Sequence, residues 1–494
     1  MLQTLKNAWS TKEIRSKILF TLFILLIYRV GTVIPVPFVE SNGFASSLNG
    51  TILQYMNVLS GGSLGAMTLF ALGVQPYINS SIIIQLLAVV FPKLGELGKN
   101  DKKKMNFITR AVTVVLAIIT AVGYYFLLRN GNGGQTFLAH QAYEGKLAWL
   151  YGIVIVACYV AGAMLIMWLA ERINEKGIGN GISMILFANI IAAVPSFVYN
   201  LVGLVVDTYS YPDRAWLYAL ISTVFAVLLI ALLLGLIAYV IYVTGSERRI
   251  PVQYAKKVVG RKMYGGQSSN LPIKLNMTGV MPIIFASSIV SFFPTVFQIL
   301  ESAGAVSETE TPGWHKFAEI IGSEGAIYPI VLFILIIAFA YFYTQITFDP
   351  MEVANNLKQQ GGAIPGIRQG RPTADFIRKV LNKITLAGAL FLGFIAVLPI
   401  ILGPHAFGPL FDWIFGGSGI YDYYYSQYLG YGAEFADQLA TMYTESWATQ
   451  QSSYLVSVFT FGGTTLLIVV GVAIETFREL EAQLTMRNYK GFLN

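Results

Sequence analysis

Runs of about 20 apolar residues recur along this chain, and they constrain its fold more than any motif does. A helix of that length crosses a hydrocarbon layer of about 30 Å. Charged residues make up only 12% of the chain, about half the share of an ordinary soluble protein. We therefore expect an all-α membrane protein of ten transmembrane helices. The runs lie at about 18–37, 68–91, 105–128, 150–171, 181–205, 216–244, 276–300, 327–348, 378–403 and 454–477.

The distribution of basic residues predicts how these helices are oriented. If the amino terminus is inside, the long basic stretches 102–104, 248–274 and 358–383 all fall on the inner side. The outer loops then receive only Arg129, Lys146, Arg214 and Lys316. Because cytoplasmic loops of membrane proteins carry an excess of Lys and Arg, both termini are predicted to be cytoplasmic.

Composition argues against several other classes of protein. The net charge of +7 belongs mostly to the inner loops, where it suits anionic lipid better than nucleic acid. The single cysteine, Cys158, excludes an intramolecular disulfide and a thiolate metal site. The chain has no phosphate-binding loop, no paired catalytic carboxylates and no nucleophile with a nearby histidine. We expect neither an enzyme nor a cofactor.

The connections between the apolar runs are mostly short, but three are long. The loops at about 245–275 and 349–377 are basic and lie on the predicted inner side. The exterior loop 404–453 is acidic and rich in tyrosine and contains no Lys or Arg, and we assign it no role.

A short amphipathic stretch at about 51–67 precedes the second apolar run. The stretch ends in several glycines. It is too short to cross a membrane and too apolar to be an ordinary exterior loop. Such a segment lies along the membrane surface or re-enters the protein, and the composition leaves both alternatives open.

Ten spans also divide into two sets of five, residues 1–205 and 216–494. Two odd-numbered halves would have opposite orientations in the membrane, as inverted repeats do. The arithmetic permits this arrangement without establishing it.

Several short motifs in a consistent order carry a resemblance to a known family. They are Tyr28–Gly31, Ile34–Pro37, Ser60–Gly62, Phe70–Ile78, Ser81–Leu86, Gly177–Ser183, Tyr254–Lys256, Asn276–Gly279, Ile284–Ser288, Pro365–Arg368 and Phe461–Thr464. Together they resemble the SecY family, the channel subunits of the bacterial protein-export translocon, across essentially the whole chain. The long exterior loop before the last span departs from the family, whose members usually have a shorter connection there.

The resemblance implies a fold and a location. It implies two five-helix halves related by inverted pseudo-symmetry, in the bacterial plasma membrane, with a short re-entrant plug helix at 51–67. The plug residues would be Thr51, Tyr55, Met56, Leu59, Gly61, Gly62 and Gly65. Glycine would act as a hinge there because it absorbs large backbone changes at little steric cost.

The resemblance also implies a ring of aliphatic side chains at a narrow waist. The ring would consist of Val74, Ile78, Leu186, Ile284 and Ile468, with Ile182 beside it. Such side chains form no hydrogen bonds with a passing chain and exclude water when the waist is closed. Taken singly, each residue is more typical of ordinary packing or of a lipid-facing surface than of a pore.

A lateral gate is implied between the second and third spans on one side and the seventh and eighth on the other. Its residues would be Asn79, Gln85, Asn276, Thr278, Ser287, Ser288 and Phe292. Interhelical hydrogen bonds in membranes contribute roughly 0.6 kcal/mol, which is weak enough for a signal sequence to break. The alternative for each serine or threonine is a bond to the backbone of its own helix.

The two basic loops would dock a partner that supplies energy, either the motor ATPase SecA or the ribosome. The residues concerned are Arg248, Arg249, Lys256, Lys257, Arg261, Lys262, Arg368 and Arg371. The alternative is that these charges only orient the chain in the membrane. The resemblance further implies SecE and SecG as companion subunits.

Sequence analysis therefore predicts a channel that moves unfolded preproteins outward, binds their signal sequences and releases apolar segments sideways into membrane lipid. The alternative is a secondary transporter of a small solute or lipid-linked precursor, which would need charged groups near the midplane. Beyond Arg29, only Glu171 and Glu475 at the inner ends of their spans are visible. For Arg29 we expect a structural counter-ion or a hydrogen bond at a helix end.

Overall fold

Ten long helices follow the order of the ten predicted apolar runs within the part of the chain that the computed structural model describes. That part comprises residues 2–40, 43–48, 52–130, 136–140, 142, 148–209, 215–254, 257–259, 262–264, 268–302, 327–402, 425, 427–428, 436–442 and 463–490. The long helices are α2 (Lys12–Gly31), α5 (Gln75–Val90), α7 (Lys102–Asn130), α9 (Ala148–Lys176), α10 (Gly181–Tyr209), α11 (Ala215–Gly245), α12 (Met281–Ser302), α14 (Ile327–Thr347), α16 (Arg371–Leu402) and α20 (Thr464–Lys490).

Shorter elements connect the long helices or lie at their ends. The short helices are α1 (Leu2–Ser10), α3 (Phe44–Ser47), α4 (Ile52–Leu59), α6 (Pro92–Asn100) and α15 (Pro350–Gln359). The strands are β1 (Glu247–Tyr254), β2 (Lys257–Val259), β3 (Lys262–Tyr264), β4 (Ser268–Lys274) and β5 (Gly362–Ala363).

Six of the described helices are long and apolar enough to cross a membrane: α7, α9, α10, α11, α14 and α16. The pair α5 and α6, which bends by 119°, makes a seventh if it counts as one span. The chain is therefore a multi-pass membrane protein. Helices α2, α12 and α20 lie in predicted apolar runs without passing the same test, so the number of ten spans stays a prediction.

Two predicted spans begin later than the apolar pattern indicated. Helix α5 starts at Gln75 rather than near 68, because the preceding turns include Gly73 at a φ of 56° and Pro76 stands in the first turn of the helix. Helix α12 starts at Met281 rather than 276, after a turn with Gly279 at a φ of 64°. Glycine adopts positive φ without steric cost, so both turns interrupt helix inside an apolar run.

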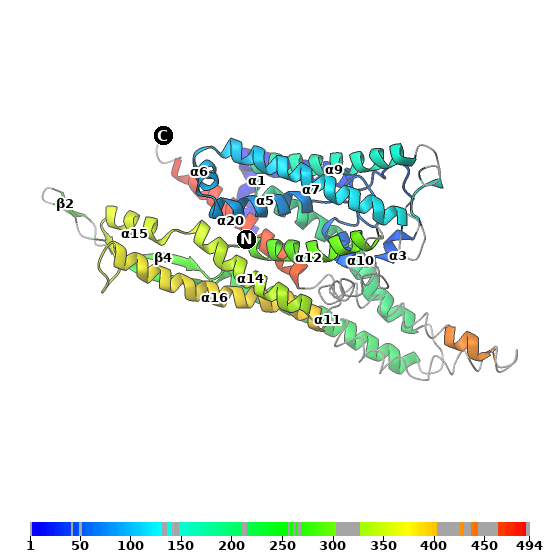
Figure 1. The fold of residues 1–494 in the computed structure, drawn as a ribbon. Helices are drawn as coiled ribbons and strands as arrows, with labels where there is room; N and C mark the ends of the chain where they lie inside the picture. Colours follow the sequence, from blue (N-terminus) through cyan, green and yellow to red (C-terminus); the bar gives the residue numbers. More distant parts are fainter. Residues whose placement is uncertain are drawn as a thin grey trace.

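The largest apolar core lies where helices from both parts of the chain meet. It joins side chains of α2, α5, α9, α10, α12, α14, α16 and α20. Within it, α12 contacts α5, α7 and α14, and α14 packs along α16 (Figure 1). A second core lies between α7, α9 and the segment that includes α3 and α4. At one end of the bundle α1 packs against α20, so the first and last described helices adjoin.

The two basic loops join in one three-stranded sheet of order β4-β1-β5. Strand β1 pairs antiparallel with β4, from Glu247 opposite Lys274 onward, and with β5, where Gln253 lies opposite Ala363. Alternate side chains of β1 point inward, so Ile250 and Val252 are buried against α15 and α16. Sequence analysis predicted long basic loops here but no strands.

Candidate functional site

Five of the predicted ring residues converge in the largest core. Val74, Ile78, Leu186, Ile284 and Ile468 are each at most 2% exposed and belong to one cluster. They come from α5 and its first turn, from α10, from α12 and from α20. Their burial excludes the alternative that they face lipid in this structure. Their role as a ring around a pore stays a prediction.

The sixth residue lies at the edge of this cluster, and a better-placed one was missed. Ile182 is partly buried and packs against the cluster from outside. Ile190 is fully buried within the cluster, four residues after Leu186. Residues four apart share a helical face, so this spacing was the signal that could have identified Ile190.

Helix α4, which corresponds to the predicted plug, lies inside the bundle and contacts α10 and α12. Leu59 belongs to the same core cluster as the ring residues. The sulfur of Met56 accepts a hydrogen bond from Thr295 Oγ1 of α12 at 3.2 Å. The segment therefore packs among the helices, and its role as a plug stays a prediction. Thr51 and the side chain of Tyr55 lie outside the described residues.

The predicted hinge glycines differ in backbone conformation and in packing. Gly61 and Gly62 have φ values of 69° and 85°, in the left-handed region that favours glycine. Gly65 instead packs closely, because a Cβ there would lie 3.0 Å from the side chain of Asn57. Its backbone N–H donates to Asn57 Oδ1 at 2.8 Å.

Two other helices donate hydrogen bonds to the end of α4. Asn189 Nδ2 on α10 donates to the Leu59 carbonyl at 2.7 Å, and Arg29 Nη1 on α2 donates to the Gly61 carbonyl at 3.1 Å. The helix-end hydrogen bond expected for Arg29 is therefore present. Asn189 was missed, since a single polar residue in an apolar run gives no sign of its partner.

The predicted seam lies between α5 with α7 on one side and α12 with α14 on the other. A small groove opens between α5, α7 and α12. Its walls include Asn79 of α5, Tyr124 of α7 and Phe292 of α12, and Met56 of α4 reaches its end. The groove is mainly apolar, with a few amide and hydroxyl groups.

One hydrogen bond closes the seam directly. The hydroxyl of Tyr343 on α14 donates to Gln85 Oε1 on α5, and Gln85 Nε2 donates to Ser81 Oγ at 2.9 Å. Asn79 Oδ1 is buried without a hydrogen-bond partner among the described residues. Gln85 thus makes the interhelical bond expected of a gate residue.

The serines of α12 behave differently. Ser287 Oγ donates to the Ile284 carbonyl of its own helix at 3.0 Å, which is the alternative that the sequence left open. Ser288 is buried in α12. Ser291, which was not predicted, bonds to the Ser287 carbonyl in the same way.

The structure corrects the placement of Asn276 and Thr278. Both were predicted to be helical, but they lie in the turn before Met281. Asn276 is 8% exposed, and its Oδ1 has no hydrogen-bond partner among the described residues. Their membership of the seam stays a prediction.

The predicted docking residues that are described lie on or beside the small sheet. Arg248 and Arg249 are exposed on β1, and Arg368 and Arg371 are exposed between β5 and α16. The hairpin of β2 and β3 carries Lys257 and Lys262, and β2 lies at the far end of the molecule from α11 (Figure 1). Lys256 and Arg261 lie outside the described residues.

Burial and neighbouring charges change the pKa of one lysine at the edge of the sheet. Burial, together with the nearby Arg478 guanidinium, lowers the pKa of Lys274 at the end of β4, while Glu247 acts in the opposite direction. Arg249 is in addition paired with Glu247 at 2.7 Å.

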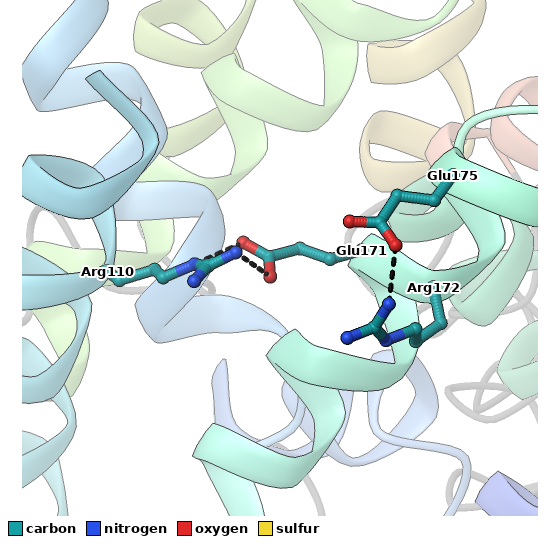
Figure 2. Close-up of polar contacts among 4 residues, drawn as sticks. All are labelled: Arg110, Glu171, Arg172 and Glu175. Atoms are coloured by element: carbon teal, nitrogen blue, oxygen red, sulfur yellow. Dashed lines mark hydrogen bonds and ion pairs between the residues drawn. The ribbon is translucent and has the colours of Figure 1, made fainter. Parts of the chain in front are cut away.

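A half-buried carboxylate that could have served a transporter is already paired. Glu171 on α9 binds Arg110 on α7 through two contacts, Nη2–Oε2 at 2.7 Å and Nε–Oε1 at 2.9 Å (Figure 2). The neighbouring pair, Arg172 with Glu175, lies one turn apart along α9 (Figure 2). The first pair fixes α7, a seam helix, to α9.

Known proteins share both the sequence and the fold. The SecY family model matches residues 68–421. The chain is 37% identical to the protein translocase subunits SecY of Streptomyces galbus and Mycobacterium bovis, each over 100% of both chains. The chain belongs to the SecY family.

Solved structures show the same fold at low identity. One described as the structure of a protein conducting channel has a TM-score of 0.57 at 16% identity, covering 95% of this chain and 92% of that one. Sec61 in the canine ribosome-channel complex from the endoplasmic reticulum has a TM-score of 0.54 at 15% identity, with the same coverage. Both confirm the helical fold of a SecY-family channel.

The ion pair in Figure 2 gives a first prediction. Removing Arg110 alone should leave Glu171 unpaired. The effects of Arg110→Ala and Glu171→Ala on the free energy of unfolding should therefore be non-additive, with a coupling of about 1–2 kcal/mol. Thermal unfolding of the purified protein would measure it. The matched control is Arg172 with Glu175, a more exposed pair one turn apart, whose coupling should be only about 0.3–0.5 kcal/mol. Equal coupling in both pairs would contradict the structural role.

Proposed function

We propose that this chain is a protein-conducting channel of the bacterial plasma membrane, with both termini in the cytoplasm. It moves unfolded preproteins outward and releases apolar segments sideways into lipid. The observation that carries this proposal is the convergence of five aliphatic residues in one core. Helix α4 packs beside that core, and a groove lies between helices of the predicted seam. Membership of the SecY family supports it.

The aliphatic core supplies the property that a channel for arbitrary sequences needs. Ile284, Ile468 and their neighbours offer no hydrogen bonds, so they do not retain any particular passing residue. When the channel is closed they pack with α4 and leave no wetted path for ions. When a chain enters, aliphatic side chains yield around it by rotamer changes.

The seam supplies a choice between crossing and leaving sideways. Each central Leu or Ile favours the bilayer by about 0.3–0.6 kcal/mol, and each Lys, Arg or Asp opposes it by about 3 kcal/mol. Over a segment of about 20 residues that sum decides the outcome without a recognition site. The mainly apolar groove bounded by Asn79 and Phe292 is the place where a signal sequence would first lie.

The energy for transport comes from a partner on the basic sheet. Because β1 pairs with both β4 and β5, the two basic loops form a single surface that carries Arg248 and Arg368. The SecA motor or the ribosome would dock there, and the ribosomal RNA would contribute its phosphates. The canine relative was solved within a ribosome-channel complex. SecE and SecG would complete the channel in the membrane.

Polar substitution in the core tests the closed seal. Ile284→Asn and Ile468→Asn should each raise the resting ion conductance several-fold, because a polar group at the constriction lets water persist there. Planar bilayer recording measures this conductance. Ile346→Asn, at an exposed position of α14, is the matched control and should leave it at the wild-type value. A resting conductance unchanged by both core variants would contradict the seal.

A covalent lock tests the seam. In a Cys158→Ser background, Asn79→Cys with Phe292→Cys should form a disulfide under oxidation and stop export of a labelled preprotein, because both residues line the same groove from opposite sides. Reduction should restore export. The control pair, Tyr125→Cys with Gly152→Cys, joins α7 to α9 on one side of the seam and should not affect export. Export that continues through the locked seam would rule out this gate.

A charge reversal tests the docking surface. Arg368→Glu should slow motor-driven translocation by about tenfold or more, since it places a like charge where an anionic partner binds. Translocation into vesicles with SecA and ATP gives the rate. As the control, Arg129→Glu makes the same charge change in the last turn of α7, on the predicted outer side, and should have little effect. Wild-type rates for Arg368→Glu would remove this residue from the docking surface.

A further inference from the structure

The turn that ends α4 satisfies most of its own hydrogen-bond acceptors. The backbone N–H groups of Ser60, Gly61 and Gly62 donate to the carbonyls of Met56, Val58 and Asn57, at 2.8–3.0 Å. The last carbonyls of a helix otherwise lack an internal partner. Helix α4 and its turn are therefore a self-contained unit that can move without losing these bonds.

Two carbonyls of this unit are instead held from outside. The Leu59 carbonyl accepts from Asn189 of α10, and the Gly61 carbonyl accepts from Arg29 of α2. A Cβ at Gly61 would lie 2.7 Å from Asn189 Oδ1 and 3.0 Å from Arg29 Nη1. The turn is thus enclosed between two side chains from two different helices, and only glycine fits at its centre.

Asn189 has few other ways to satisfy its amide. It is fully buried, its Oδ1 has no hydrogen-bond partner among the described residues, and it lies three residues after Leu186 of the apolar cluster. If α4 moved away, Asn189 would lose the Leu59 carbonyl, and the buried Tyr28 hydroxyl would be the polar group left beside its amide. A buried donor without a partner costs more than an ordinary hydrogen bond contributes, so Asn189 favours the closed position of α4.

We propose that Asn189 and Arg29 form a latch that holds α4 closed by binding the main-chain carbonyls of Leu59 and Gly61. This inference rests on the proposed channel function and names two residues that control its resting state. Both hydrogen bonds of the latch are made to main-chain carbonyls of α4 and its turn rather than to side chains. A translocating polypeptide presents the same carbonyl group at every residue, so it can take the place of α4 at Asn189 whatever its sequence.

The position of α4 can be measured apart from transport. Met56 and Thr295 are in contact across α4 and α12. In a Cys158→Ser background, Met56→Cys with Thr295→Cys should crosslink readily with a short thiol reagent while α4 is closed. The full-length protein is reconstituted in lipid with no preprotein. Crosslinking is measured with the cysteine pair present, and ion conductance is recorded from the protein without the pair.

Loss of either donor should shift both measurements. Asn189→Leu and Arg29→Met should each raise the resting conductance by about threefold to thirtyfold and lower the crosslinking yield in step, with a larger effect when combined. Arg29 is exposed, so Arg29→Met tests the latch even if Asn189→Leu does not fold. The matched control is Ser183→Ala, which removes another buried polar group of α10 that has no hydrogen-bond partner among the described residues.

The outcomes separate this inference from the proposed function. Wild-type crosslinking and conductance in both single variants would overturn the latch, while export by the wild-type protein would leave the channel function standing. A change in Ser183→Ala as large as in the two variants would also overturn it, because any loss of packing in α10 would then suffice. Both would be refuted if the Met56→Cys, Thr295→Cys protein with an intact latch did not crosslink at rest and the wild-type protein did not export preprotein.

Discussion

The packing of aliphatic side chains from both parts of the chain into one core is the interaction on which the rest of this structure depends. Ile78 and Leu186 come from the first part, and Ile284 and Ile468 come from the second. Their contacts are dispersion contacts, which are individually weak, non-directional and indifferent to what replaces them. A seal of this kind can be broken and remade around any polypeptide, whereas a seal of specific hydrogen bonds would favour some sequences and retain them.

In the proposed channel, the polar groups beside this core would have a different role, which is to give the closed state a definite geometry. The bond from Tyr343 to Gln85 crosses the seam, and Asn189 and Arg29 hold the end of α4. Each such bond in a membrane contributes roughly 0.6 kcal/mol on average. A few of them bias a two-state equilibrium by an amount that an entering apolar segment can outweigh. In the proposed channel, the apolar core would determine what can pass, and the polar bonds would determine when the channel opens.

The apolar pattern predicted the order of the long helices, since length and hydropathy suffice for that. The ring residues came from the resemblance to the SecY family, because the apolar pattern alone could not separate buried from lipid-facing positions. The pattern did not predict where α5 and α12 begin, because Gly73 and Gly279 interrupt helix within apolar runs and hydropathy does not register backbone conformation. It also missed Asn189 and the sheet. The partners of both lie far away in the sequence, and only the tertiary fold brings them together.

Helix α12 connects the parts of the site that sequence analysis treated separately. Strand β4 of the basic sheet ends at Lys274, and the chain then passes through one short turn into α12, which carries both Ile284 of the core and Phe292 of the seam. That turn is tied back to the sheet, because the Leu275 backbone N–H donates to the Ser246 carbonyl at 3.0 Å. In the proposed channel, a partner that displaced the sheet would therefore act on α12 directly. Because α12 carries residues of both the proposed seal and the predicted seam, one partner outside the membrane would reach both through the same helix.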